Sequence, residues 1–393
     1  MTDSDFNRRR EEFPTLASGI HLLSHSLGPM PRAARASIEA YCDLWERHTS
    51  EDAWAASWWT LSEEVGDCVA RILGGAPGSV QMQPNASVAL STAVSCFDFA
   101  ETGRNGIVTT ALDFPSMGYI WDAQQRLGAR VEVVPSEDGV AVSAERILDA
   151  IGETTCLVAL SHTSYRSSHR LREEDVRAIV ARAHACGARV LLDVYQSAGA
   201  LELDAAGWGV DFLIGGMIKW LCGGPSCGYL YVRPEIQSEL EPRLTGWIAH
   251  AQPFAFSHER MAYAPGVRRF AQGTPNIPGL YSCLAGLKII EEVGLPVIAR
   301  ESRRRTESMV EFALARGWRL NSPHDADRRG GSVMIRVDNG PETVARLAER
   351  NVFVDCRPGV GLRASPHFFN TDDEVQEAME ILAAAIDARE PEK

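Results

Sequence analysis

Short apolar runs alternate with amphipathic segments between residues 80 and 215. The runs are rich in β-branched residues and predict strands at 107–110, 131–134, 156–160, 190–194 and 211–214. A segment from 173 to 186 predicts a helix: Val176, Ile179 and Val180 share one face of it, and a glycine follows as a stop signal. Buried strands separated by helices predict an α/β fold with a mostly parallel sheet and helices on both faces.

The pattern changes on either side of this region. Residues 31–73 predict a long helical region, whose four tryptophans predict core or subunit interface: Trp45, Trp54, Trp58 and Trp59. After residue 290 an α+β pattern follows, with helices at 297–316, 341–350 and 372–388 and strands at 332–337 and 352–355. We therefore expect an N-terminal segment (1–20) lying on the outside of the body, a large domain (21–290) and a smaller α+β C-terminal domain (291–393).

Composition narrows the classes of partner and location. The chain has 393 residues and a net charge of −13, which argues against a nucleic-acid partner. Its N-terminus has no apolar core, and no apolar run is long enough for a membrane span, so we expect a cytoplasmic protein. Nine dispersed cysteines without a Cys-x-x-Cys pair predict reduced thiols, with neither a disulfide framework nor a metal site.

The stretch from Val190 to Val232 carries the strongest chemical signal. Asp193 ends one apolar strand, and Lys219 follows the next strand in an apolar, glycine-rich setting. Burial lowers the pKa of a lysine and makes it a nucleophile for Schiff bases. A nearby aspartate is the partner that the ring nitrogen of pyridoxal phosphate needs. The alternatives are a strand-end aspartate that caps a turn and a lysine that reaches solvent. Gly215-Gly216 favours the cofactor site over these alternatives, because glycines allow close approach of the backbone to a ligand.

Several motifs, taken in order, resemble the class V aminotransferase family of pyridoxal phosphate enzymes, and kynureninases within it. Single motifs are weak, but they run in order from about residue 20 to residue 380. They are Ser26–Pro29, Phe114–Ser116, Asp193–Ala200, Gly207–Phe212, Lys219–Pro225, Gly246-Trp247, Gly273–Pro275 and Leu362–His367. The resemblance implies the aspartate aminotransferase-like fold (fold type I of these enzymes) with a smaller C-terminal domain.

The resemblance also implies a role for each matching residue. Lys219 would form the internal aldimine with pyridoxal 5′-phosphate and move the proton at the substrate α-carbon, and Asp193 would pair with the ring nitrogen. Phe114 would stack on the ring, Gln196 would hydrogen-bond its phenolic oxygen, and Ala86 and Ser87 would start a helix that seats the phosphate. The alternatives without a cofactor are that Phe114 is an ordinary core residue and that Ala86 and Ser87 only begin a helix.

The remaining matches concern the substrate and a second subunit. Arg363 matches the arginine that clamps the substrate α-carboxylate. Tyr165 and Arg166 follow the strand 156–160 and are expected to border the substrate. Trp247 and Thr274 match positions that reach the phosphate of the neighbouring subunit, which implies a homodimer with shared active sites.

Two departures bear on the reaction. Kynureninases carry a histidine where this chain has Gln196, and a tyrosine where it has Ile218. That tyrosine is tied to protonation during cleavage of the Cβ–Cγ bond. Cys356 is the sole candidate for the loop cysteine of desulfurase-like relatives, and its setting predicts a structural role.

Three reactions on an L-α-amino acid therefore stay open. Kynureninase-like cleavage at the β-carbon is the first choice, and transamination to a keto acid or epimerisation are the alternatives. From a different class, the chain could be a non-catalytic relative that only binds cofactor or ligand. A nucleotide-binding dehydrogenase is disfavoured, because no Gly-x-Gly-x-x-Gly follows a strand.

Overall fold

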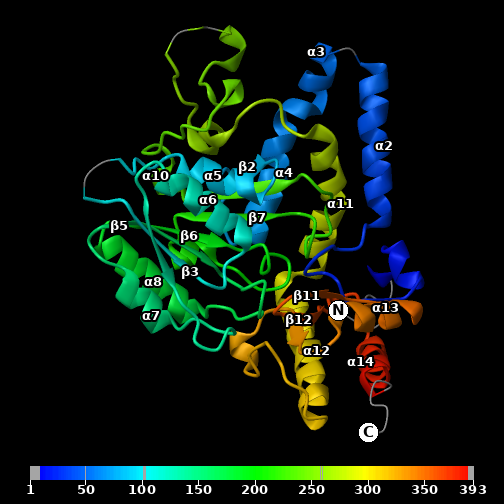
Figure 1. The fold of residues 1–393 in the computed structure, drawn as a ribbon. Coiled ribbons are helices and arrows are strands. Elements are labelled where there is room, and N and C mark those ends of the chain that lie inside the picture. Colours follow the sequence, from blue (N-terminus) through cyan, green and yellow to red (C-terminus); the bar gives the residue numbers. More distant parts are fainter. Residues whose placement is uncertain (1–8, 49, 101–102, 257, 259, 388–393) are drawn as a thin grey trace.

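A seven-stranded sheet forms the centre of the computed structural model, which describes residues 9–48, 50–100, 103–256, 258 and 260–387 (Figure 1). The strand order is β2-β8-β7-β6-β5-β3-β4; β8 pairs antiparallel with β2 and β7, and the other neighbouring pairs are parallel. The strands are β2 (Val80–Gln83), β3 (Gly106–Thr110), β4 (Arg130–Val134), β5 (Thr155–Ser161), β6 (Arg189–Asp193), β7 (Phe212–Gly216) and β8 (Gly228–Val232). The expected mostly parallel α/β fold is confirmed.

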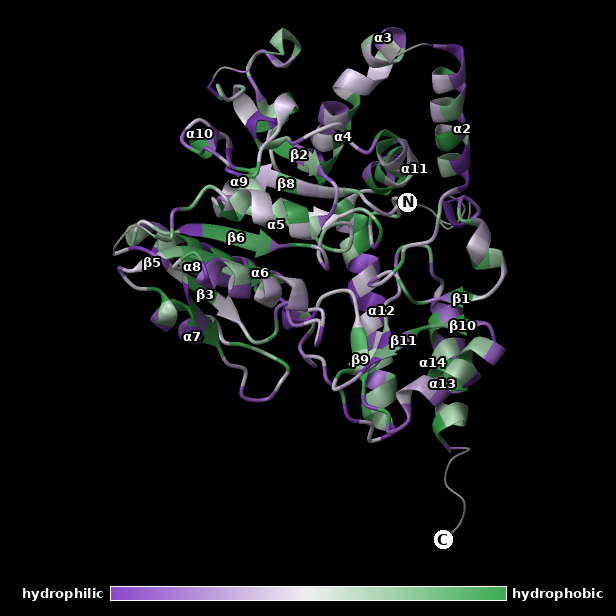
Figure 2. Cartoon of the chain, turned by 45° about the horizontal axis from the view of Figure 1, so that its top comes forward, coloured by the Kyte–Doolittle hydropathy of each residue, from purple (hydrophilic) through white to green (hydrophobic). Residues whose placement is uncertain are grey.

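Two hydrophobic cores explain why the strands are apolar along their whole length. Val190 and Leu192 of β6 point into one core, and Leu191 between them points into the other. Figure 2 shows β6 as mostly hydrophobic. Helices from both sides cover these faces. The helices of this part are α5 (Ala86–Val94), α6 (Pro115–Gln125), α7 (Ala144–Ala150), α8 (Glu173–Ala185), α9 (Ala205–Trp208) and α10 (Pro234–Gln237).

The helical region predicted at 31–73 is divided. It consists of α2 (Arg32–Arg47), α3 (Ser50–Ala53), a π-helical turn (Trp54–Trp58) and α4 (Trp59–Ile72). The backbone of His48 is extended, so the chain leaves α2 there and α4 returns to the sheet (Figure 1). Trp54 and Trp58 pack partly against the core, whereas Trp45 is 62% exposed. The amphipathic pattern predicted helix but contained no signal for the reversal.

The C-terminal part has its own three-stranded sheet, of order β11-β12-β9. The strand predicted at 352–355 is split, because the chain changes partner at Val354. The elements of the C-terminal part are α11 (Ile277–Val293), α12 (Leu295–Ala315), β9 (Val333–Ile335), α13 (Gly340–Glu349), β10 (Val352–Phe353), β11 (Asp355–Arg357), β12 (Gly361–Ala364) and α14 (Asp372–Asp387). The predicted end of the last helix, Ala388, lies outside the described residues.

The described part of the N-terminal segment (9–20) lies on the outside, as expected, and is anchored by three buried apolar side chains, Phe13, Leu16 and Ile20. The ring centroid of Phe13 is 5.0 Å from that of Phe369, and its side chain is 1% exposed. Strand β1 (Ile20–His21) pairs in parallel with β10. Apolar side chains that would otherwise face water drive this packing. Among the described helices, none combines the length and the apolarity needed to cross a bilayer.

Candidate active site

A cavity of about 260 Å³ opens at the carboxyl ends of the parallel strands. We call it the Lys219 cavity. Seven of the residues singled out from the sequence line it: Ala86, Ser87, Phe114, Tyr165, Asp193, Gln196 and Lys219. Four others, Arg166, Trp247, Thr274 and Arg363, lie outside its lining. The structure thus brings together the residues assigned to the cofactor within one subunit.

Lys219 follows β7 and reaches into the cavity between aromatic rings. Its Nζ lies 4.0 Å from the ring centroid of Tyr195 and 5.9 Å from that of Phe114. Burial lowers the pKa of Lys219 to about 8, against the opposing influence of the Asp193 charge. The amine forms no ion pair within the described chain. It is therefore far closer to its neutral, nucleophilic form at pH 7 than an ordinary lysine.

Asp193 is the last residue of β6 and has one oxygen committed. Its Oδ1 accepts the backbone N–H of Tyr195 at 2.8 Å. Burial raises the pKa of Asp193 to about 6, and the nearby Lys219 charge opposes this effect. The second carboxylate oxygen has no partner among the described residues. A cationic N–H at this end of the cavity would find an acceptor there.

Helix α5 presents free backbone donors to the cavity. Asn85 caps the helix by accepting the N–H of Val88 at 2.9 Å, which leaves the N–H groups of Ala86 and Ser87 without partners in the described chain. The helix can begin here only because β8 starts with Gly228. A Cβ at that glycine would lie 2.5 Å from the Asn85 carbonyl carbon. The arrangement suits a phosphate.

Phe114 is held at the mouth of the cavity by its neighbour Asp113. The Asp113 carboxylate accepts the N–H groups of Thr110 and Ser161, both at 2.7 Å. Phe114 remains 43% exposed, and its ring meets that of Tyr165 edge-on at 5.0 Å. A phenylalanine this exposed at a strand end is available to stack on a flat ligand.

The glycine pair at the end of β7, Gly215-Gly216, makes room for something other than the ligand expected from the sequence. A Cβ at Gly215 would lie 2.2 Å from the hydroxyl of Tyr229, and one at Gly216 would lie 2.4 Å from that of Tyr195. The glycines make room for these tyrosines, not for a ligand. Tyr195, which sequence reasoning missed, thereby reaches its place beside Lys219; its position two residues after Asp193 was the available signal.

The two positions that depart from kynureninases differ in their surroundings. Gln196 lines the cavity; its Nε2 donates to the carbonyl of His25 at 3.0 Å, and its Oε1 accepts Trp220 Nε1–H at 3.0 Å. One amide hydrogen of Gln196 is left for a ligand. Ile218 is half-buried, and its carbonyl accepts the N–H of Gly28 at 2.8 Å. It has no proton to donate from its side chain.

Arg363 is buried beside the cavity and already has a carboxylate partner. Its Nε and Nη2 donate to Asp355 at 2.8 and 2.7 Å. Sequence reasoning did not identify Asp355 as this partner, although Pro358-Gly359 signals a tight hairpin that sets residue 355 opposite residue 363. Cys356 points the other way: a Cβ at Gly340 of α13 would lie 2.9 Å from its Sγ, so the thiol packs against that helix.

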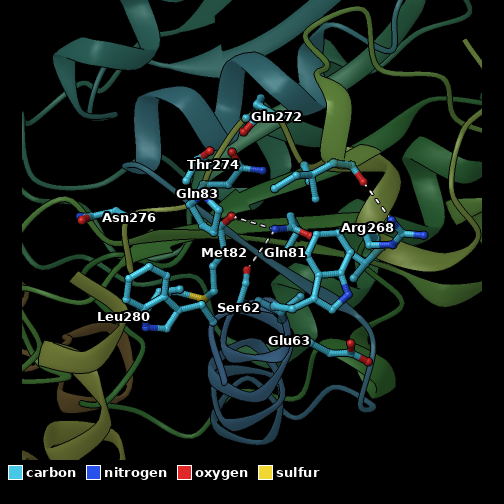
Figure 3. Close-up of a pocket in the computed structure, with 18 of the residues that line it drawn as sticks. Ser62, Glu63, Gln81, Met82, Gln83, Arg268, Gln272, Thr274, Asn276 and Leu280 are labelled. Carbon is cyan, nitrogen blue, oxygen red and sulfur yellow. Dashed lines mark hydrogen bonds between the residues drawn. The ribbon is translucent and has the colours of Figure 1, made fainter. Parts of the chain in front are cut away.

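A second, larger cavity of about 560 Å³ contains Thr274, and we call it the aromatic cavity (Figure 3). Trp54, Trp58 and Trp59 line it, and Gln81 in its wall donates to Ser62 Oγ at 3.3 Å. The ring of Trp247 lies beside it, 6.3 Å from that of Trp59. Arg166 lies elsewhere: a Cβ at Gly359 would be 3.5 Å from its Nη2.

Curated relatives match nearly the whole chain. The family model described as "Aminotransferase class-V" matches residues 45–377. The chain is 30% identical to an uncharacterized aminotransferase, YcbU, of Bacillus subtilis, over 95% of this chain and 96% of the relative. It is 31% identical to a kynureninase of Deinococcus radiodurans (97% and 93% covered) and 28% identical to one of Pseudomonas fluorescens (97% and 92% covered).

Solved structures share the fold. The apo cysteine desulfurase of Thermococcus onnurineus superposes with a TM-score of 0.86 at 22% identity, covering 99% of both chains. The protein C-DES, in a mutant with glycine covalently linked to the PLP cofactor, gives 0.84 at 23% identity, covering 95% of this chain and 98% of that one. From the family match, the relatives and the fold, this chain belongs to the class V aminotransferase family and is a pyridoxal 5′-phosphate-dependent enzyme.

Proposed function

We propose that this enzyme cleaves a bond at the β-carbon of an L-α-amino acid, in the manner of kynureninases. The observation that carries the proposal is the likeness to kynureninases over 97% of the chain. The Lys219 cavity supports it, because a buried amine, a strand-end carboxylate and a helix start meet there. Transamination and epimerisation are outcomes that the experiment below distinguishes.

The cavity residues fit the cofactor. Free N–H groups of Ala86 and Ser87 suit its phosphate, the open oxygen of Asp193 suits its ring nitrogen, and Phe114 offers a ring face. When bound, pyridoxal phosphate supplies an aldehyde carbon that condenses with amines and a ring that takes up electrons from the substrate α-carbon. Lys219 holds the cofactor and afterwards removes or returns the α-proton at its Nζ.

Cleavage at the β-carbon also requires a proton there. Ile218 cannot donate one, so we assign this task to the phenol of Tyr165, which lines the cavity next to Phe114. Gln196 orients the cofactor with its remaining amide hydrogen. Arg363 receives the substrate carboxylate. Arg166, whose guanidinium lies near Gly359 in the β11–β12 turn, borders the substrate.

The proposed enzyme is a cytoplasmic homodimer. An exposed aromatic surface supports association: Trp247, Phe254 and Phe256 are 37, 61 and 73% exposed. Thr274 is also exposed. Trp247 and Thr274 would bind the phosphate in the partner's cavity. The odd, dispersed set of nine cysteines supports a reducing compartment.

The reaction is tested by incubating the enzyme, loaded with pyridoxal phosphate, with L-kynurenine and a panel of other L-amino acids. Each incubation is run with and without pyruvate. Release of alanine or pyruvate without added keto acid is the expected result. Turnover that depends strictly on the keto acid would instead identify an aminotransferase, and loss of optical purity without release would identify an epimerase.

A further inference from the structure

The loop from Leu22 to Gly28 joins the two halves of the molecule beneath Lys219. On one side, Leu23 pairs with Ser365 just after β12. On the other side, the N–H of Gly28 donates to the carbonyl of Ile218 at 2.8 Å. A Cβ at Gly28 would lie 2.1 Å from the Lys219 carbonyl oxygen, so no other residue fits there without displacing the backbone. The loop therefore couples the position of Lys219 to that of β12.

His25 stands at the centre of this loop and is 1% exposed. Its Nδ1 lies 2.6 Å from Ser365 Oγ, and its Nε2 lies 3.1 Å from Asp355 Oδ1. Burial lowers the pKa of His25 to about 4, so the ring is neutral at pH 7 and carries one N–H. Since a carboxylate only accepts, Nε2–H donates to Asp355 and Nδ1 accepts the Ser365 hydroxyl.

Asp355 connects His25 to Arg363. Its two oxygens accept the Nε–H and Nη2–H of the guanidinium, and Oδ2 also forms an ion pair with Arg357 Nη2 at 3.0 Å. Although burial alone would raise it, hydrogen bonds from His25 and Arg363 lower the pKa of Asp355 below its ordinary value. Asp355 therefore stays charged.

The other edge of the Arg363 guanidinium is left for a ligand. Its Nη1 has one long contact, 3.5 Å, with the carbonyl of Tyr165, a residue that lines the Lys219 cavity. The charge of Arg363 also depresses the pKa of Lys219, as expected of a cation close to this cavity. The carbonyl of His25 meanwhile accepts Gln196 Nε2 at 3.0 Å. His25 thus contacts both Asp355, which binds Arg363, and Gln196, which is assigned to the cofactor.

We propose that Asp355 and His25 are positioning residues that present the Nη1–Nη2 edge of Arg363 to the substrate α-carboxylate, at a fixed place relative to Lys219. The inference rests on the proposed function, in which Arg363 receives that carboxylate. A guanidinium held along one edge keeps its orientation before the substrate arrives, so less conformational freedom is lost on binding. This positioning role also explains why a half-buried carboxylate lies beside the arginine and leaves its Nη1–Nη2 edge open.

The test uses the enzyme loaded with pyridoxal phosphate and measures binding of L-alanine and L-alaninamide by calorimetry. The ratio of the two affinities reports recognition of the carboxylate alone. Asp355→Asn should reduce this ratio by about tenfold, and His25→Leu by about threefold to tenfold. Alaninamide affinity and the visible absorption of the cofactor should stay unchanged. Arg357→Ala, which removes a half-exposed partner of the same carboxylate, is the matched control and should keep the ratio.

Each outcome decides one point. An unchanged ratio in both variants, or an equal loss for alanine and alaninamide, would overturn the positioning role. His25→Leu provides the test if Asp355→Asn does not fold. Failure of the proposed function has a separate signature in the unmodified enzyme: no preference for alanine over alaninamide would remove the carboxylate role of Arg363, and this inference with it.

Discussion

The Lys219 cavity and the aromatic cavity lie on either side of the short connection between β2 and α5. They differ in the kinds of side chain that line them. The first is lined by strand ends and carries buried charges whose pKa values are displaced toward each other, Lys219 to about 8 and Asp193 to about 6. The second is lined by tryptophans and opens beside exposed rings such as Phe254. The groups proposed for bond chemistry thus lie in the first cavity, and the residues proposed for association lie in and beside the second.

The largest expected effect comes from removing the amine of the Lys219 cavity. Lys219→Ala should abolish the visible absorption of bound cofactor and lower turnover by at least about a thousandfold, since both attachment and proton transfer depend on Nζ. Absorption spectra and steady-state rates measure this. Lys288→Ala, at a lysine whose side chain is 76% exposed, is the control and should change neither. An intact visible band in Lys219→Ala would refute the assignment.

The pH dependence of cofactor attachment tests the lowered pKa of Lys219 in the Lys219 cavity. The reactive form is the neutral amine, which is populated above the pKa. With a pKa of about 8, the attachment rate of the cofactor-free enzyme should rise about tenfold from pH 7 to pH 9 and then level off. An ordinary lysine would give about a hundredfold rise over that range and no plateau. Stopped-flow absorbance distinguishes the two profiles.

Tyr165→Phe separates the two proton transfers proposed within the cavity. Release of the cleaved product should fall by about a hundredfold, because the phenol that protonates the β-carbon is lost. Exchange of the substrate α-proton in deuterated water, which needs Lys219, should persist and is followed by NMR. Equal losses in both measurements would argue for a general disturbance of the cavity.

The aromatic region can be tested by mixing subunits. The double variant Trp247→Ala, Thr274→Val should bind cofactor about tenfold more weakly, because it lacks two contacts to phosphate. If these residues serve the partner's cavity, mixing this variant with Lys219→Ala should restore part of the activity, since hybrid dimers contain one unaltered site. Absence of restoration, with hybrids verified by mass, would contradict shared sites.

The smallest effect concerns Phe114. Phe114→Leu keeps an apolar side chain but loses the ring face, so cofactor affinity should fall by about threefold to tenfold. Equilibrium titration of the cofactor-free enzyme measures it. Phe254→Leu, a change of the same kind in the aromatic region at a residue 61% exposed, should leave cofactor binding within a single subunit unchanged.

Much of the fold was predictable because its signals are local. Strand ends, turns and helix starts are set by a few adjacent residues, so the five strands from residue 107 to residue 216 were found with small errors at their ends. The reversal after α2 was not, since an amphipathic pattern is the same in one long helix and in two packed ones. Strand 352–355 divided because pairing with β1 and β12 depends on segments far away in the chain.

The sequence by itself determined that an aspartate and a lysine follow neighbouring strands, since parallel strands place their carboxyl ends at one edge of the sheet. Only the tertiary structure decided which residues surround Arg363. His25 and Asp355, separated by 330 positions, meet because β1 pairs with β10, which is followed directly by β11 in the chain. Gly215 and Gly216 are likewise required because two tyrosines from other segments of the chain pack against their backbone. Periodicity reports which residues are buried; what they are buried against is settled by packing between distant segments.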